Sequence, residues 1–189
     1  MKRSDGSGGS RGSGRVRRAL RPAYAAAVVG CAAASIECGK LVLAVVPNVE
    51  VVTLLTALYG YVFGWYGILA AVVFVTIEPL IYGFGPWVIS YYLYWPFVAL
   101  VFALLGRAKV RNRAVLTGTA VLLTIWFGVL TSLVDVGLFS GHFERFFYRF
   151  SVFYARGFVF YAIQVACNAV LFPLVFRFLS DRLARLRIL

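Results

Sequence analysis

The stretch from Leu41 to Gly106 reads LVLAVVPNVEVVTLLTALYGYVFGWYGILAAVVFVTIEPLIYGFGPWVISYYLYWPFVALVFALLG and contains no lysine or arginine. Its only charged residues are Glu50 and Glu78. One helix needs about 20 residues to cross a bilayer, so this stretch is long enough for about three crossings. We therefore expect it to fold back on itself within a membrane.

The composition of the whole chain supports this interpretation. Hydrophobic residues make up 62% of the 189 residues and charged residues only 14%, which leaves too little polar material to cover a water-soluble domain. The net charge of +12 is concentrated between the apolar segments, and no nucleic-acid-binding motif accompanies it. The sequence therefore indicates an integral protein of the lipid bilayer and argues against a nucleic-acid partner.

Glycines, prolines and charges divide the chain into six apolar segments. The expected helices cover residues 20–46, 50–64, 67–83, 87–106, 114–139 and 152–178, and the second is short for a full crossing. Residues 1–19 are rich in glycine, serine and charge, so they are expected to form a disordered basic tail. Residues 20–180 then form an all-α integral membrane domain, a six-transmembrane-helix bundle, and residues 181–189 form a second basic tail.

The cations fall mainly on one side of such a bundle. Seven lie in residues 1–21, four in residues 107–113 and four in residues 177–189, which places 15 of the 19 together. Because cytoplasmic loops carry the excess of lysine and arginine, both termini are predicted to be cytoplasmic, in a multi-pass protein of the plasma membrane. A count of five or seven spans would destroy this asymmetry.

Ionisable and amide side chains from several helices are expected at a similar depth, near the outer side. Charges within a membrane are costly and usually face a bundle interior or a water-filled cavity, which favours a shared outward-facing cavity. The other interpretation is an internal Glu37–Lys40 ion pair, with the remaining acids reaching the interface. The candidate cavity residues are Glu37, Lys40, Glu50, Glu78, Asp135, Arg156, Gln164 and Asn168.

Four aromatic residues follow one side of the helix expected at 87–106, and these are Trp87, Tyr91, Tyr94 and Trp95. Tyrosine and tryptophan near a membrane surface usually form an interfacial belt. The alternative is a wall on which a planar or ring-shaped ligand stacks, in which case these residues belong to the same binding site.

Motifs for catalysis or metal binding are missing from the sequence. It has no Walker A loop, no HExxH motif and no serine–histidine–aspartate set. Its three cysteines have neither metal-binding nor disulfide-framework spacing. The sequence therefore gives no indication of an enzyme, a metal site or a bound cofactor.

The chain resembles the substrate-binding S components of energy-coupling factor (ECF) transporters, a branch of the ABC importers. The resemblance rests on a basic start before an alanine-rich helix, on the Pro47-Asn48-Val49-Glu50 turn followed by LTALYGYVFGWYGILAAVVF, and on six spans in under 190 residues. It implies a subunit without its own ATPase that captures a small water-soluble vitamin or cofactor precursor outside. Delivery inward would require a transmembrane coupling (T) subunit and two ABC-type ATPases.

The resemblance also implies where the partners bind. An alanine-x-x-x-alanine face on the first helix of such proteins contacts the coupling subunit; Ala23 and Ala27 match it here, and the Ala26/Gly30 pair fits nearly as well. The ligand pocket lies at the outer side, between helices four to six and the outer loops. The metal-binding branch uses an amino-terminal histidine, from which Met1-Lys2-Arg3 departs, so nickel or cobalt is not expected.

Two other classes of function remain open on the sequence alone. A stand-alone secondary transporter or channel could use the buried acids to carry protons or cations. An intramembrane enzyme or scaffold is the third possibility. The S component is favoured because the chain has no obvious internal repeat and has a small-residue docking helix.

Overall fold

The computed structural model describes residues 9–46, 49–139 and 145–186, and all regular structure within them is helical. The helices are α1 (Gly9–Leu43), α2 (Val52–Phe63), α3 (Trp65–Tyr82), α4 (Trp87–Arg107), α5 (Arg113–Val134), α6 (Phe146–Leu171) and α7 (Arg177–Ala184). Two further segments are π-helical. The first, η1 (Asp135–Phe139), continues α5, and the second, η2 (Phe172–Phe176), joins α6 to α7. The all-α class predicted from the sequence is confirmed.

Five of these helices are long and apolar enough to cross a membrane. The candidate spans are Pro22–Leu43, Trp65–Tyr82, Trp87–Arg107, Arg113–Phe139 and Phe146–Ala184. The remaining apolar helix, α2, has 12 residues and is about 18 Å long, well below the ~30 Å of a hydrocarbon core. The sequence correctly predicts that this helix is short.

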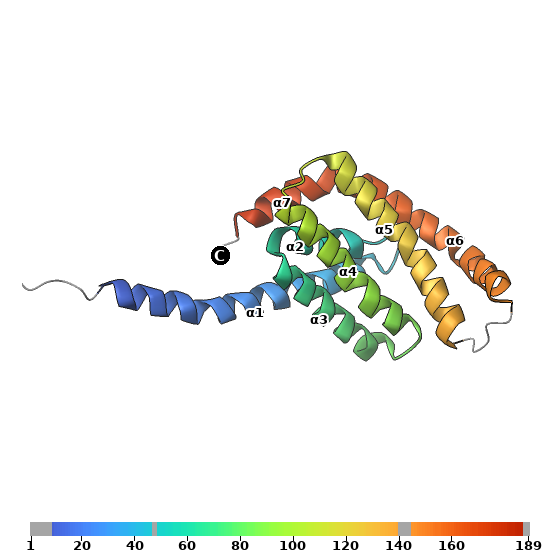
Figure 1. Ribbon diagram of the computed structural model, residues 1–189, viewed down its shortest axis with the longest axis horizontal. Coiled ribbons are helices and arrows are strands. Elements are labelled where there is room, and N and C mark those ends of the chain that lie inside the picture. The colour runs from blue at the N-terminus through green and yellow to red at the C-terminus, as the bar shows by residue number, and fades with distance from the viewer. Residues whose placement is uncertain (1–8, 47–48, 140–144, 187–189) are drawn as a thin grey trace, which may run out of the picture.

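The short helix α2 lies inside the bundle. Eight of its 12 residues are buried, and it contacts α1, α3, α4, α5, α6 and α7. Neighbouring helices therefore cover it on most sides. Figure 1 shows α3 and α4 as one antiparallel pair and α5 and α6 as another, while α1 extends beyond the other helices at its N-terminal end.

Local sequence explains the ends of several helices. Gly64 has a φ of 59°, a left-handed conformation that suits glycine, and it makes the tight reversal between α2 and α3. The side chain of Asn112 caps α5 by accepting hydrogen bonds from the backbone N–H groups of Ala114 and Val115. The predicted turn at Pro47-Asn48 lies outside the described residues.

Three helix boundaries differ from the sequence-based expectation. Helix α1 begins at Gly9 rather than near residue 20, so residues 9–19, predicted to be a disordered tail, are drawn as helix. Helix α6 begins at Phe146 rather than at residue 152, because Phe146, Phe150 and Tyr154 stack at four-residue spacing, which favours helix. Helix α7 continues to Ala184, inside the predicted carboxy-terminal tail. Residues 1–8 and 187–189 of the two predicted tails lie outside the described residues.

Helices α2 and α4 approach each other closely at two glycines. A Cβ atom at Gly60 would lie 2.2 Å from the backbone oxygen of Ala99, and one at Gly106 would lie 2.2 Å from that of Tyr61. Small residues are what allow helix backbones to approach this closely within a membrane.

Replacing Gly60 by alanine is therefore expected to push α2 and α4 apart and to destabilise the protein by about 1–3 kcal/mol, the usual cost of overpacking. Gly118→Ala is the matched control, because nothing lies within 4 Å of a Cβ atom at Gly118. Thermal unfolding of both variants in detergent measures the difference. Equal melting temperatures for the two variants would contradict the close contact.

Candidate functional site

A cavity of about 280 Å³ opens at the end of the bundle where α1 ends and α2 begins. It lies between the carboxy-terminal part of α1, the start of α2, and side chains of α3, α4 and α6. Five of the residues predicted for a binding site line it, and these are Lys40, Glu50, Tyr91, Trp95 and Gln164. The volume is close to the lower limit of typical small-molecule sites.

Lys40 reaches across from α1 to α3 and pairs with Glu78. The Glu78 side chain is 1% exposed, whereas that of Lys40 is 27% exposed because it also faces the cavity. The Lys40 ammonium lies 4.2 Å from the centroid of the Tyr82 ring and 5.8 Å from that of Tyr91, both within the range of a cation–π contact. The pair that forms is thus Lys40–Glu78, between two helices, and not the Glu37–Lys40 pair considered from the sequence.

The second acid of α1, Glu37, lies beside this ion pair. Glu37 is 7% exposed, and neither of its carboxyl oxygens has a hydrogen-bond partner among the described residues. Its carboxyl group interacts with Glu78 and Lys40. With both carboxyl groups ionised, the cluster of Glu37, Glu78 and Lys40 carries a net charge of −1. One bound proton or one bound cation would neutralise it.

Glu50 approaches the cavity from the connection before α2. One of its carboxylate oxygens accepts a hydrogen bond of 2.8 Å from the Thr53 hydroxyl, and its backbone oxygen lies 3.4 Å from the Cys167 sulfur of α6. Burial raises the pKa of the Glu50 carboxyl above its ordinary value, and the hydrogen bond from Thr53 opposes this shift. Glu50 therefore places a carboxyl group at the cavity wall, within the influence of Thr53, Asn168 and Lys40.

The aromatic residues of α4 form one connected cluster. Ring centroids are 5.0 Å apart for Trp87 and Tyr91, 5.8 Å for Tyr91 and Trp95, and 4.7 Å for Tyr94 and Trp95. Tyr91 and Trp95 line the cavity, while Tyr94 is 1% exposed and packs behind them against Phe127. The arrangement places a wall of rings on the α4 side of the cavity.

Two buried polar atoms of the lining have no hydrogen-bond partner in the described structure. They are the indole Nε1 of Trp95, a donor, and the amide Oε1 of Gln164, an acceptor. Both residues are at least 95% buried. Because buried polar groups are almost always hydrogen-bonded, an unpartnered donor and acceptor beside one cavity indicate that water or a ligand completes them.

The other predicted site residues lie apart from the lining. Asn168 is fully buried and donates a 3.0 Å hydrogen bond to the Thr124 hydroxyl, which ties α6 to α5. Trp87 supports Tyr91 from outside the cavity. Asp135 lies in η1 and Arg156 is exposed on α6, and neither contributes to the cavity wall.

The three predicted docking residues all lie at the surface of the protein. Ala23, Ala27 and Gly30 are all exposed on α1, and a Cβ atom at Gly30 would meet nothing within 4 Å. Ala32 and Ala33 on the same helix are instead buried in the bundle. The small-residue face of α1 is therefore exposed on the described part of the chain.

Sequence reasoning missed three aromatic residues of the lining. Tyr82, Phe74 and Phe160 all contribute to the cavity. Tyr82 lies four residues after Glu78, so the two share a face of α3, and this spacing could have identified it. Phe74 and Phe160 lie in uniformly apolar segments, where nothing distinguishes them from other core residues.

Comparison of the chain with models of protein families, with curated proteins and with solved structures found no match.

Proposed function

We propose that this protein is the substrate-binding subunit of an ECF-type importer. It captures a small water-soluble vitamin or cofactor precursor in the cavity beside Lys40 and Glu50 and performs no ATP hydrolysis itself. The observation that carries the proposal is the pair of unpartnered buried atoms, Trp95 Nε1 and Gln164 Oε1, at the wall of this cavity. Such atoms are explained by a ligand that both accepts and donates hydrogen bonds.

The chemistry of the wall supports a ring-shaped ligand with at least one polar or ionised group. Tyr91 and Trp95 offer ring surfaces, and Glu50 and Lys40 offer one charge of each sign. Mostly apolar cavities with a few convergent polar groups are typical of small-molecule sites. This composition is unlike that of a wide aqueous pore.

The proposed orientation follows from charge. The start of α1, the loop between α4 and α5, and the segment from Arg177 to Arg185 together carry 12 of the 16 lysines and arginines within the described residues. The Tyr24 hydroxyl of α1 donates to the backbone oxygen of Leu186, so the first and last of these lie together, and we place this end in the cytoplasm. The cavity then opens to the outside, with both termini cytoplasmic in the plasma membrane. Helix α2 would be the sixth membrane segment, shielded from lipid by its neighbours.

The proposed partners are a transmembrane coupling subunit and two ABC-type ATPases. Ala23, Ala27 and Gly30 present an exposed small-residue face on α1, which suits close approach of a second helix. Gly30→Leu should therefore prevent association. Gly118→Leu is the matched control, because Gly118 is also exposed with open space around it.

Co-purification from the native membrane tests the proposal. The unaltered protein and Gly118→Leu are expected to retain two ATPase subunits and a coupling subunit, identified by mass spectrometry, whereas Gly30→Leu is expected to lose them while remaining monodisperse. Uptake by liposomes should then require the complete complex and ATP.

A stand-alone proton- or cation-coupled transporter is the second candidate. It is favoured by the buried Glu37–Glu78–Lys40 cluster, which is one proton or cation short of neutrality. Uptake by liposomes that contain only the purified chain, driven by an ion gradient, would support this candidate and contradict the first.

A further inference from the structure

A second cavity, of about 150 Å³, lies at the opposite end of α4 from the first. Gly106 lines it, and Tyr91 lines the first cavity, so the two are separated by about 22 Å along the helix. The wall contains Tyr61 of α2, Arg111 of the loop between α4 and α5, and Arg177, Ser180 and Asp181 of α7. None of these residues has a role in the function proposed above.

Positive charge is in excess around this cavity. The loop and α7 region contains Arg107, Lys109, Arg111, Arg113, Arg177, Arg182 and Arg185, and Asp181 is the one acid of these two described segments. Within the wall itself there are two guanidinium groups and one carboxylate, so the cavity carries a net charge of about +1.

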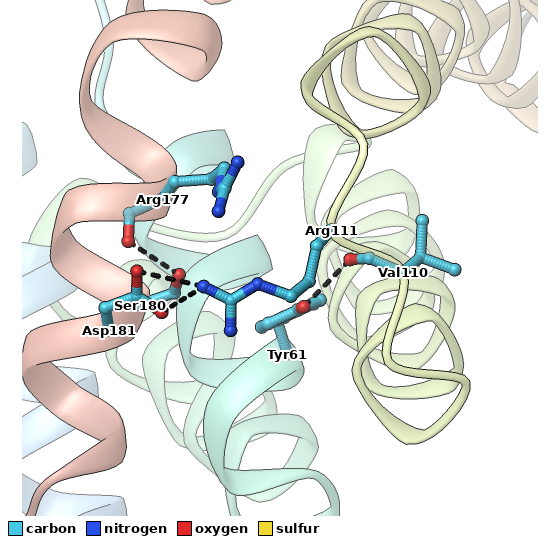
Figure 2. Close-up of polar contacts among 6 residues, drawn as sticks. All are labelled: Tyr61, Val110, Arg111, Arg177, Ser180 and Asp181. Carbon is cyan, nitrogen blue, oxygen red and sulfur yellow. Dashed lines mark hydrogen bonds and ion pairs between the residues drawn. The ribbon is translucent and has the colours of Figure 1, made fainter.

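Arg111 is held in position from two sides. Its Nη2 donates to both carboxylate oxygens of Asp181, at 3.0 and 3.2 Å. The preceding residue, Val110, is fixed because its backbone oxygen accepts a 2.8 Å hydrogen bond from the Tyr61 hydroxyl. Figure 2 shows the Arg111 side chain extending from the loop toward α7 in this arrangement.

Donors remain free for a ligand. Arginine has five N–H donors, and Arg111 uses only those of Nη2 for Asp181. The guanidinium of Arg177 makes no hydrogen bond or ion pair with any described residue. Figure 2 shows the Arg177 side chain extending from α7 toward the side from which Arg111 approaches. Two guanidinium groups converging on one cavity are suited to bind a phosphate group.

The charge balance selects the kind of phosphate. A net charge of about +1 matches a phosphodiester, which carries one negative charge, better than a phosphomonoester, whose second charge Asp181 would repel. A third cavity, of about 390 Å³, shares Tyr61, Val62 and Gly106 with the phosphate cavity and is otherwise lined largely by apolar residues, including Trp65 and Leu104. An apolar neighbour suits acyl chains.

We propose that the cavity between Arg111 and Arg177 binds the phosphodiester headgroup of an anionic phospholipid. Basic pockets between helices at a membrane surface bind such headgroups. The proposal does not depend on the identity of any transported solute, because the site is at the other end of the bundle.

The test compares lipids added to the purified full-length protein in neutral detergent. Phosphatidylglycerol is expected to raise the melting temperature, and to stay bound in native mass spectra, more than phosphatidylcholine does. Inorganic phosphate and glycerol 3-phosphate should have little effect. Arg177→Gln is expected to raise the dissociation constant for phosphatidylglycerol about tenfold or more, as loss of a charge-assisted hydrogen bond does.

Arg185→Gln is the matched control, because Arg185 directly follows α7, is exposed and does not line the cavity. It should retain binding. Should Arg177→Gln not fold, Arg177→Lys keeps the charge, removes the planar fork and should still weaken binding. Equal stabilisation by both lipids, an equal loss in Arg185→Gln, or stabilisation by the soluble phosphates as large as that by phosphatidylglycerol would overturn the proposal.

Discussion

Replacing Lys40 by methionine is expected to reduce the free energy of unfolding by about 3–5 kcal/mol, the range found when one partner of a buried ion pair is removed. Glu78 is 1% exposed and would lose its only ion-pair partner among the described residues. Glu37, also buried beside it, would become a second carboxyl group without a cation nearby. Denaturant titration in mixed micelles measures the change.

A double variant separates the ion pair from simple packing. Lys40→Met together with Glu78→Gln removes both charges, so most of the lost stability should return, because replacing a whole buried pair is far less costly than breaking it. Lys109→Met is the control for the substitution itself, since Lys109 is exposed and makes no ion pair with described residues. A double variant as unstable as Lys40→Met would show that the pair is not the source of the effect.

Replacing Gln164 by leucine is expected to have opposite effects on stability and on ligand binding. The Gln164 Oε1 has no partner in the described structure of the free protein, so removing the amide should leave stability unchanged or raise it. If a ligand donates to this atom, affinity should fall by about tenfold, equivalent to about 1.4 kcal/mol. Thermal unfolding without ligand and isothermal titration with ligand measure the two effects.

Asn168→Leu is the matched comparison for the stability of Gln164→Leu. Asn168 lies one turn further along α6, is fully buried and donates to Thr124. Its replacement should destabilise the free protein, because the change removes an existing hydrogen bond between helices. Loss of stability in Gln164→Leu of the same size would indicate that Gln164 has a structural role, which would contradict its assignment to the ligand.

The helices themselves could be predicted from the sequence because hydropathy and glycine placement determine them locally. The shortness of α2 follows from a mostly apolar segment of 12 residues between turn signals, and the reversal follows from Gly64, because glycine readily adopts a positive φ. The interior position of α2 depends instead on the close approach at Gly60 and Gly106, and a glycine in a sequence does not reveal which helix it will contact.

The charged cluster was predictable in composition but not in pairing. Glu37 and Lys40 share a helix, so spacing alone favours their pairing, but the ammonium of a long side chain reaches Glu78 on α3 instead. Asp135 and Arg156 are also charged residues within apolar segments, yet Asp135 lies in η1, Arg156 is exposed on α6, and neither lines the cavity. Packing between helices decides which side of a helix faces the cavity, and the sequence alone does not show it.

The central claim is that the cavity beside Lys40 and Glu50 binds a small water-soluble molecule. Thermal unfolding of the purified protein against a panel of vitamins and vitamin precursors tests it most directly. One compound, or a narrow group of related compounds, is predicted to raise the melting temperature with a saturable dependence on its concentration. A ligand at a concentration of a hundred times its dissociation constant adds about 2.7 kcal/mol to the free energy of unfolding. No shift with any compound, or an equal shift in Gln164→Leu at limiting ligand, would contradict the claim.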